Sequence, residues 1–196
     1  MEIMNLVVTG TVGAGKTTFI RSVSEIEVVD TDRRATDDVA NLKQNTTVAM
    51  DFGTLQFGEE MALHIYGTPG QIRFDFMWEI LIERAHAYVL LIAAHRPSEF
   101  HHARRIMNFM NRRAQIPMII GITHSDCEGA WSSEDIALAL GYQDIAQQPP
   151  IVLVNADEAE SVAIALISLV EHCMQSTAAA AVAIPLLSLW TEREIW

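Results

Sequence analysis

Short apolar runs alternate with amphipathic stretches along most of the chain. Short apolar runs that end at a glycine or a polar turn are typical of buried parallel strands, and stretches with a period near 3.6 residues are typical of helices packed on a sheet. The pattern predicts strands at residues 3–8, 48–57, 61–66, 88–92, 117–122 and 151–154, and helices at residues 16–24, 76–85, 98–113, 132–140 and 157–174.

The alternation of the two kinds of segment predicts a doubly wound, mostly parallel α/β sheet of six strands with helices on both faces. Residues 48–57 and 61–66 flank a three-residue turn, so we expect a hairpin that adds one antiparallel edge strand. Residues 25–47 are polar and acidic without a clear period, which is typical of a long functional surface loop.

We expect residues 1–174 to form one domain and residues 175–196 to form an apolar C-terminal extension. The extension is rich in alanine and leucine and contains Pro185. Because its apolar side chains are unfavourable in water, we expect it to fold back onto the domain or to pack against another chain. No run of about 18 apolar residues occurs, so we expect no transmembrane segment, and no leader segment is indicated.

The strongest motif lies at residues 10–17, where GTVGAGKT matches GxxxxGK[ST] between a predicted strand and a predicted helix. Such a P-loop turns backbone N–H groups inward as an anion nest at the positive end of the helix. Lys16 can reach the β- and γ-phosphates of a nucleotide, and the Thr17 hydroxyl can ligate Mg²⁺. The residues predicted to hold the phosphates are Gly10, Thr11, Gly13, Ala14, Gly15, Lys16, Thr17 and Thr18.

Two later segments fit the γ-phosphate and metal side of such a site. A threonine at the end of the long loop, Thr46 or Thr47, can ligate Mg²⁺ and sense the γ-phosphate. After the hairpin, Gly70 can offer its N–H to the γ-phosphate and Gln71 can orient an attacking water. We therefore predict that Gln71 and Lys16 are catalytic.

Two further segments, which follow the last two predicted strands, fit the base side. Asp126, in the segment Thr123, His124, Ser125, Asp126, can accept both N1–H and N2–H of guanine, whereas adenine offers no such pair of donors. In the segment Asn155, Ala156, Asp157, a backbone N–H can meet guanine O6. The sequence therefore favours guanine over adenine.

Together these segments resemble the small Ras-like GTPases over roughly residues 3–174, and more finely the bacterial small GTPases of the conservon and gliding-motility type. The resemblance is carried by residues 10–18, 46–53, 67–71, 73–74, 77–78 and 170–172. It implies a cytoplasmic signalling switch that binds GTP or GDP with Mg²⁺ on Thr17 and Thr47, hydrolyses GTP slowly and works beside a roadblock-type regulatory protein. Thr47 is preferred over Thr46 because the Val-Ala-Met that follows it is similar to the family's strand entry.

Several positions depart from the family's pattern. Gly67 stands where the family has an aspartate that supports Mg²⁺, and Asp51 on the neighbouring strand either substitutes for it or only anchors the hairpin. Of the family's Asn-Lys-x-Asp only Asp126 is kept, so His124 is a candidate to stack on the base. Asp157 replaces a second base-covering lysine. Two alternatives therefore stay open: a nucleotide-binding interaction module without hydrolysis, and an ATP-binding P-loop protein.

The composition narrows the partners. With 13 Lys and Arg against 25 Asp and Glu the net charge is −12, which argues against general affinity for nucleic acid or anionic lipid. Half of the residues are apolar, so the chain can bury a core and is not disordered overall. Its two cysteines, Cys127 and Cys173, have neither a disulfide framework nor metal-ligand spacing. This is the composition of an acidic protein of a reducing compartment.

Arginine is concentrated in a few segments. The predicted helix 98–113 carries four arginines and two histidines, which form either a docking face for an acidic partner or a solvated face. Arg33, Arg34 and Arg73 lie in the two loops predicted to flank the γ-phosphate, where one of them is either an internal arginine finger or a solvated side chain.

Overall fold

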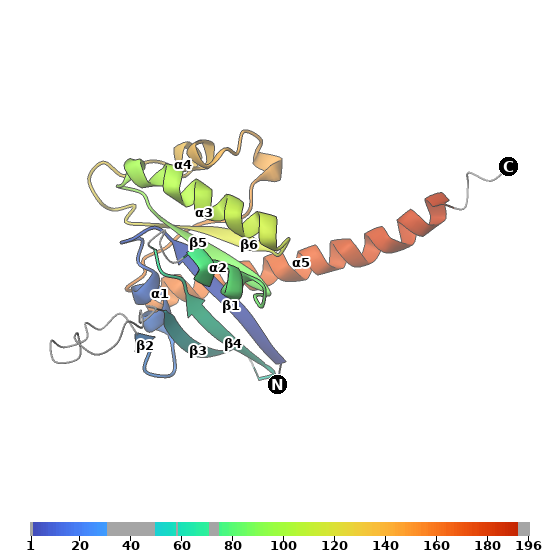
Figure 1. Cartoon of the computed structure of the whole chain (residues 1–196), viewed down its shortest axis with the longest axis horizontal. Coiled ribbons are helices and arrows are strands. Elements are labelled where there is room, and N and C mark those ends of the chain that lie inside the picture. Colours follow the sequence, from blue (N-terminus) through green and yellow to red (C-terminus); the bar gives the residue numbers. More distant parts are fainter. Residues whose placement is uncertain (1, 31–49, 58, 71–74, 192–196) are drawn as a thin grey trace.

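The computed structural model describes residues 2–30, 50–57, 59–70 and 75–191, with side chains at residues 29, 30, 57, 75, 145 and 177–191 left out of the description. A seven-stranded sheet forms its centre (Figure 1). The strands are β1 (Glu2–Gly10), β2 (Val29–Asp30), β3 (Asp51–Phe57), β4 (Met61–Gly67), β5 (Ala87–Ala93), β6 (Met118–Thr123) and β7 (Ile151–Leu153). The helices are α1 (Lys16–Val23), α2 (Asp75–Ile82), α3 (Phe100–Arg113), α4 (Ser133–Leu140) and α5 (Ala159–Thr191), with short 3₁₀ turns η2 (Pro97–Glu99) and η3 (Ile145–Gln147).

The strand order β2-β3-β4-β1-β5-β6-β7 confirms the predicted α/β class. β4, β1, β5, β6 and β7 are parallel, and β3 is antiparallel to β4, as the hairpin pattern indicates. All six predicted strands are present. The sheet gains one strand that periodicity could not reveal, the two-residue β2, which pairs antiparallel with β3 at the edge.

Two apolar clusters cover the two faces of this sheet. Side chains of β1 and β5 alternate between them: Val7 and Leu90 lie in one cluster, whereas Leu6 and Leu91 lie in the other. The first cluster includes residues of α2, α3 and α4, and the second includes residues of α1 and α5. Because the strands are buried on both sides, they appear in the sequence as continuous apolar runs.

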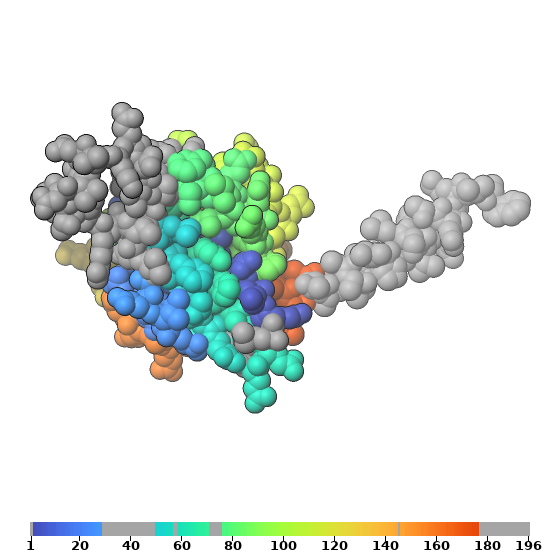
Figure 2. Space-filling model, turned by 60° about the horizontal axis from the view of Figure 1, so that its bottom comes forward, coloured from blue at the N-terminus to red at the C-terminus, as the bar shows by residue number. Residues whose placement is uncertain are grey.

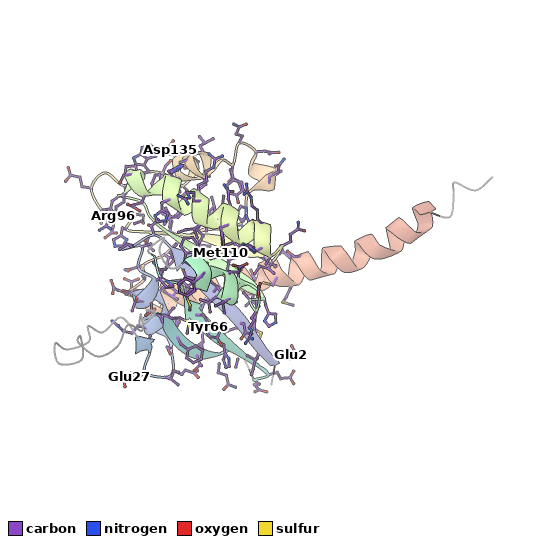
Figure 3. The ribbon with its side chains drawn as sticks, viewed as in Figure 1. Glu2, Glu27, Tyr66, Arg96, Met110 and Asp135 are labelled. Carbon is purple, nitrogen blue, oxygen red and sulfur yellow. The ribbon has the colours of Figure 1, made fainter. Side chains whose placement is uncertain are left out.

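The parallel topology places the carboxyl ends of β1, β4, β5, β6 and β7 along one edge of the sheet. In doubly wound folds this edge is where ligands bind. Among the described residues, the segments predicted from sequence to hold the phosphates and the base leave the sheet here, since they follow β1, β4, β6 and β7 directly. In Figure 3 this edge lies near the labelled Arg96, and Glu2 marks the opposite end of β1.

The last helix is longer than the sequence pattern predicts. We expected it to end near residue 174, but α5 continues without a break through Pro185 to Thr191. The alanines that follow Thr177 are the strongest helix formers, which explains the continuation. How the side chains of residues 177–196 pack lies outside the described residues. Within the described part of the chain, no helix has the combined length and apolar character needed to cross a bilayer.

Candidate functional site

The loop between β1 and α1 is shaped by its glycines. Gly10, Gly13 and Gly15 all have positive φ, at 147°, 77° and 89°. A side chain at Gly10 would collide with the Leu91 carbonyl of β5, so strand packing as well as backbone angle requires glycine there. The loop then enters α1 at Lys16, whose first backbone N–H groups lack helical acceptors. The local structure is therefore the anion-binding turn that the motif predicts.

Lys16 is nearly buried beneath this loop, with 9% of its surface exposed. Its Nζ donates hydrogen bonds to the carbonyl oxygens of Gly10 at 3.0 Å and Thr11 at 2.7 Å. Burial lowers the pKa of Lys16 to about 8, and the charge of Asp51 partly opposes this shift. An anion bound in the loop would favour the charged ammonium and restore a higher pKa. Lys16 is therefore suited to an anionic ligand.

The segment after β4 lies against the same loop. The Thr68 N–H donates to the Val8 carbonyl, and its hydroxyl donates to Thr9 Oγ1 at 2.9 Å. A side chain at Gly70 would be 2.8 Å from the Val12 nitrogen and 2.9 Å from Lys16 Nζ. Gly70 therefore lies beside the phosphate loop, as predicted for a residue that senses a terminal phosphate. Gln71, the predicted water-orienting residue, lies outside the described residues.

The carboxylate of Asp51 lies beside the predicted metal ligand Thr17. The Thr17 hydroxyl donates to Asp51 Oδ2 at 2.6 Å, and Asp51 is only 8% exposed. Asp51 pairs directly with Gly67 across β3 and β4. A side chain at Gly67 would come within 2.9 Å of Asp51 Cβ and 3.0 Å of its Oδ2. Asp51 from the adjacent strand, together with Ile20 Cδ1 at 2.8 Å, therefore fills the space that a side chain at position 67 would occupy.

This pair of oxygen donors fits a small hard cation. A hydroxyl and a carboxylate are ligands of the type that Mg²⁺ takes, together with water and phosphate oxygens. Among the described residues, no three His, Cys, Asp or Glu side chains gather as a metal site. A protein-only cage for a transition metal is thus absent from that part of the chain. Thr47, the other predicted Mg²⁺ ligand, lies outside it, as do Thr46, Arg33, Arg34 and Arg73.

A hollow of about 400 Å³ lies beside the phosphate loop. The segments that follow β6 and β7 meet there, although they are some thirty residues apart in sequence. Its lining includes all six predicted base-side residues, namely Thr123, His124, Asp126, Asn155, Ala156 and Asp157. Thr123 connects it to the phosphate loop, because its hydroxyl donates to the Ala14 carbonyl at 3.1 Å.

The polar groups of this hollow differ in their exposure and in the hydrogen bonds that they make within the chain. Asp126 is exposed. The Asn155 N–H donates to Ser161 Oγ, and the Asp157 N–H donates to the Asn155 side chain. His124 has a left-handed backbone, with φ of 55°, which is uncommon for a residue with a side chain. Its ring is 4.8 Å from that of His95.

Sequence reasoning missed the residues that follow β5. Arg96 donates from Nη1 to the Val12 carbonyl at 3.3 Å and covers Gly13, where an added side chain would collide with the guanidinium. Its Nε also contacts His95 Nε2 at 3.3 Å. Burial lowers the pKa of His95, with further lowering by the charges of His124 and Arg96. The strand order explains their position, since β5 pairs parallel with β1 and its carboxyl end therefore lies beside the phosphate loop.

The chain is similar to one protein family and to a solved small GTPase. A family model described as "Conserved hypothetical ATP binding protein" matches residues 26–176, which leaves out the phosphate loop. The solved structure of the Arl6 (BBS3) small GTPase from Trypanosoma brucei, with bound nucleotide analogue GppNp, is similar with a TM-score of 0.67 and 16% sequence identity. The match covers 89% of this chain and 99% of that one. No curated protein matches.

The packing of Asp51 against Gly67 predicts an energetic coupling. Gly67→Asp places a second carboxylate beside the first in a buried position, so we expect a loss of about 1–3 kcal/mol in the free energy of unfolding. Moving the carboxylate, in the double variant Asp51→Gly with Gly67→Asp, should recover about 1 kcal/mol relative to Gly67→Asp alone. Urea unfolding of the parent protein, of Asp51→Gly, of Gly67→Asp and of the double variant measures these free energies. If the double variant lost the sum of the free energies lost by the two single variants, the two side chains would not share one space.

The contacts of Arg96 predict that it stiffens the phosphate loop. In Arg96→Ala, amide hydrogen exchange at residues 12–14 should become about two- to fivefold faster, since one hydrogen bond of modest strength is lost. Arg96→Lys should restore part of the protection, because a lysine can reach the same carbonyl. Arg84→Ala, an exposed arginine ahead of β5, is the matched control and should leave exchange at these amides unchanged. Equal exchange in Arg96→Ala and the parent would refute the role.

Proposed function

We propose that this chain, which belongs to the family described as conserved hypothetical ATP-binding proteins, is a guanine-nucleotide-binding switch that hydrolyses GTP slowly. It has the P-loop fold of a small GTPase. The observation that carries the proposal is the hydrogen bond from Thr123 to Ala14. It joins an anion-binding loop over Lys16 to a hollow lined by Asp126. The groups proposed to bind the phosphates and the base are thereby adjacent.

The proposed preference for guanine over adenine rests on Asp126. Its carboxylate accepts two donors, and guanine presents N1–H and N2–H side by side, whereas adenine presents an acceptor at N1. The description of the family names ATP, so adenine is the rival base. His124, whose ring is tilted against that of His95 at 4.8 Å, is available as a flat surface for the base in place of the missing lysine stem.

We propose that Mg²⁺ binds the Thr17 hydroxyl, which lies beside Asp51, and that Thr47 of the long loop is a further ligand. A bound Mg²⁺ would neutralise the charge of the terminal phosphates. The role of Asp51 is to accept the Thr17 hydroxyl proton in a hydrogen bond, which orients the hydroxyl oxygen. Gly67 then needs no side chain of its own.

The position of Gly70 supports the proposed switch. A side chain at Gly70 would lie 2.9 Å from Lys16 Nζ, and we propose that a γ-phosphate bound by this lysine displaces the adjacent loop of Thr68, Pro69 and Gly70. The loop therefore has a different position with a triphosphate than without it. In the displaced position the Gly70 N–H donates to the phosphate, Gln71 orients the attacking water and Lys16 offsets the developing charge.

The finer identity of the chain and its regulator also belong to this proposal. The motifs at residues 46–53 and 67–71 resemble bacterial small GTPases of the conservon and gliding-motility type. Members of that group work beside roadblock-type dimeric regulators, so we propose such a protein as the activator of hydrolysis. A nucleotide-binding interaction module without hydrolysis is the second candidate, favoured by the reduced base motifs.

Competition between labelled GDP and ADP tests the base. With Mg²⁺ present we expect GDP to bind about 10- to 100-fold more tightly, because adenine leaves the Asp126 carboxylate without its two donors. Asp126→Asn should remove this preference and gain affinity for XDP, whose C2 carbonyl accepts from the asparagine amide. Lys16→Ala is the control for the phosphates and should weaken all three nucleotides together. Equal affinity for GDP and ADP would overturn the guanine assignment.

Phosphate release tests the reaction. Gln71→Leu should lower the single-turnover rate of GTP hydrolysis about 10- to 100-fold while leaving GTP affinity unchanged, since the side chain is proposed to act only on the water. Loss of binding and rate together would count against that role. No phosphate release from the parent protein at all, with nucleotide bound, would favour the interaction module.

A further inference from the structure

A groove between α2 and α3 is separate from the nucleotide site. It has a volume of about 380 Å³. Figure 2 shows α2 in green beside α3 in yellow-green on this part of the surface. The groove is lined by Trp78 from α2 and by His102, Arg105, Asn108, Phe109, Arg112 and Arg113 from α3.

The groove is basic in a strongly acidic protein. The net charge is −12, yet α3 carries four arginines and no acidic residue. Glu79 of α2 pairs with Arg113 at 2.6 Å. Arg105 and Arg112 are exposed and have no ion-pair partner among the described residues. Two cationic side chains are therefore available at this groove for an external anion.

Arg104, the neighbour of Arg105, has a different environment. A side chain at Gly141 would come within 2.9 Å of the Arg104 guanidinium, so Arg104 lies against the C-terminal end of α4. Helix C-termini favour positive charge. Arg104 thus has a structural explanation within this fold, whereas Arg105 and Arg112 do not.

The groove also has an apolar floor. The rings of Trp78 and Phe109 meet edge to face at 5.7 Å, and Arg113 lies 5.3 Å from the Phe109 ring centre. His102 contributes Nε2, a shielded ring nitrogen without a hydrogen-bond partner in the described part of the chain. Arginines around an aromatic floor suit a ligand that has both carboxylates and an apolar side chain.

Trp78 connects this floor to the loop of Thr68, Pro69 and Gly70. Its Nε1–H donates to the Pro69 carbonyl at 2.9 Å, and Pro69 precedes Gly70, which lies beside Lys16. A shift of this loop must therefore lengthen the hydrogen bond or carry the indole with it. In either case the floor of the groove responds.

We propose that the groove docks an acidic segment of a partner protein. Carboxylates of the segment pair with Arg105 and Arg112, and an apolar side chain packs on Trp78 and Phe109. Long nucleic acids are disfavoured, because the rest of the protein repels polyanions. The docking is also coupled to nucleotide state through Trp78. This coupling rests on the proposed function.

A nuclear magnetic resonance titration of the full chain tests the docking. The probe is a short blocked peptide of glutamate and leucine. The control peptide has glutamine in place of glutamate. The reporter is the indole N–H signal of Trp78, assigned with Trp78→Phe. We expect the glutamate peptide to shift this signal and the amides of residues 105–113, and the glutamine peptide to shift neither.

Charge reversal separates docking from general attraction. Arg105→Glu and Arg112→Glu should each weaken binding of the glutamate peptide about tenfold. Arg104→Glu, with the same change of net charge, should weaken it less than twofold. Equal loss in all three variants, absence of shifts at Trp78, or tighter binding of a single-stranded DNA oligonucleotide in this groove would overturn the proposal.

The coupling is measured separately from the nucleotide site. With GDP and then with GppNp, we expect different positions of the Trp78 indole signal and different affinities for the glutamate peptide. If both nucleotides bind and neither quantity changes, the coupling is wrong and the proposed function stands. If no nucleotide binds, the proposed function fails, and the peptide titration still decides the docking.

Discussion

The burial of one ammonium group is the constraint on which the rest of the site depends. Lys16 lies under the loop that joins β1 to α1, where, among the described residues, two carbonyl oxygens accept from its Nζ and Asp51 is a nearby negative charge. Burial of a charged amine is unfavourable unless an anion or several dipoles compensate it, which is why its pKa falls to about 8. A bound anion would relieve this cost, which is the basis of the proposed phosphate site.

One departure from the small-GTPase motifs has a structural explanation. Gly67 lacks the expected carboxylate, but Asp51 provides one from the adjacent antiparallel strand in direct register. Paired strands lie about 5 Å apart, so a carboxylate can lie on the neighbouring strand and still reach the same point. Arg96 is a separate case: it brings a cation from the end of β5 to the phosphate loop, whereas the lysine that His124 replaces is expected to cover the base.

Contacts also connect the site to the surface. Gly70 lies beside Lys16, Pro69 accepts a hydrogen bond from Trp78, and Trp78 packs on Phe109 of α3. Each step is a direct contact between neighbours, so the arrangement offers a physical route from the phosphate loop to the basic groove. The two-position loop proposed above supplies the bistable element that such a route requires.

By itself the sequence determined the α/β class, the six main strands and the phosphate loop, because apolar runs, glycine spacing and Lys16 act over a few residues. It also placed Asp126 and Asn155 at strand ends, and topology then implied that they meet. Tertiary structure alone decided that Asp51 fills the space at Gly67, that Arg96 covers Gly13, and that Arg105 faces a groove while Arg104 packs at α4. These outcomes depend on strand register and side-chain direction between distant segments, and local pattern carries no information about either.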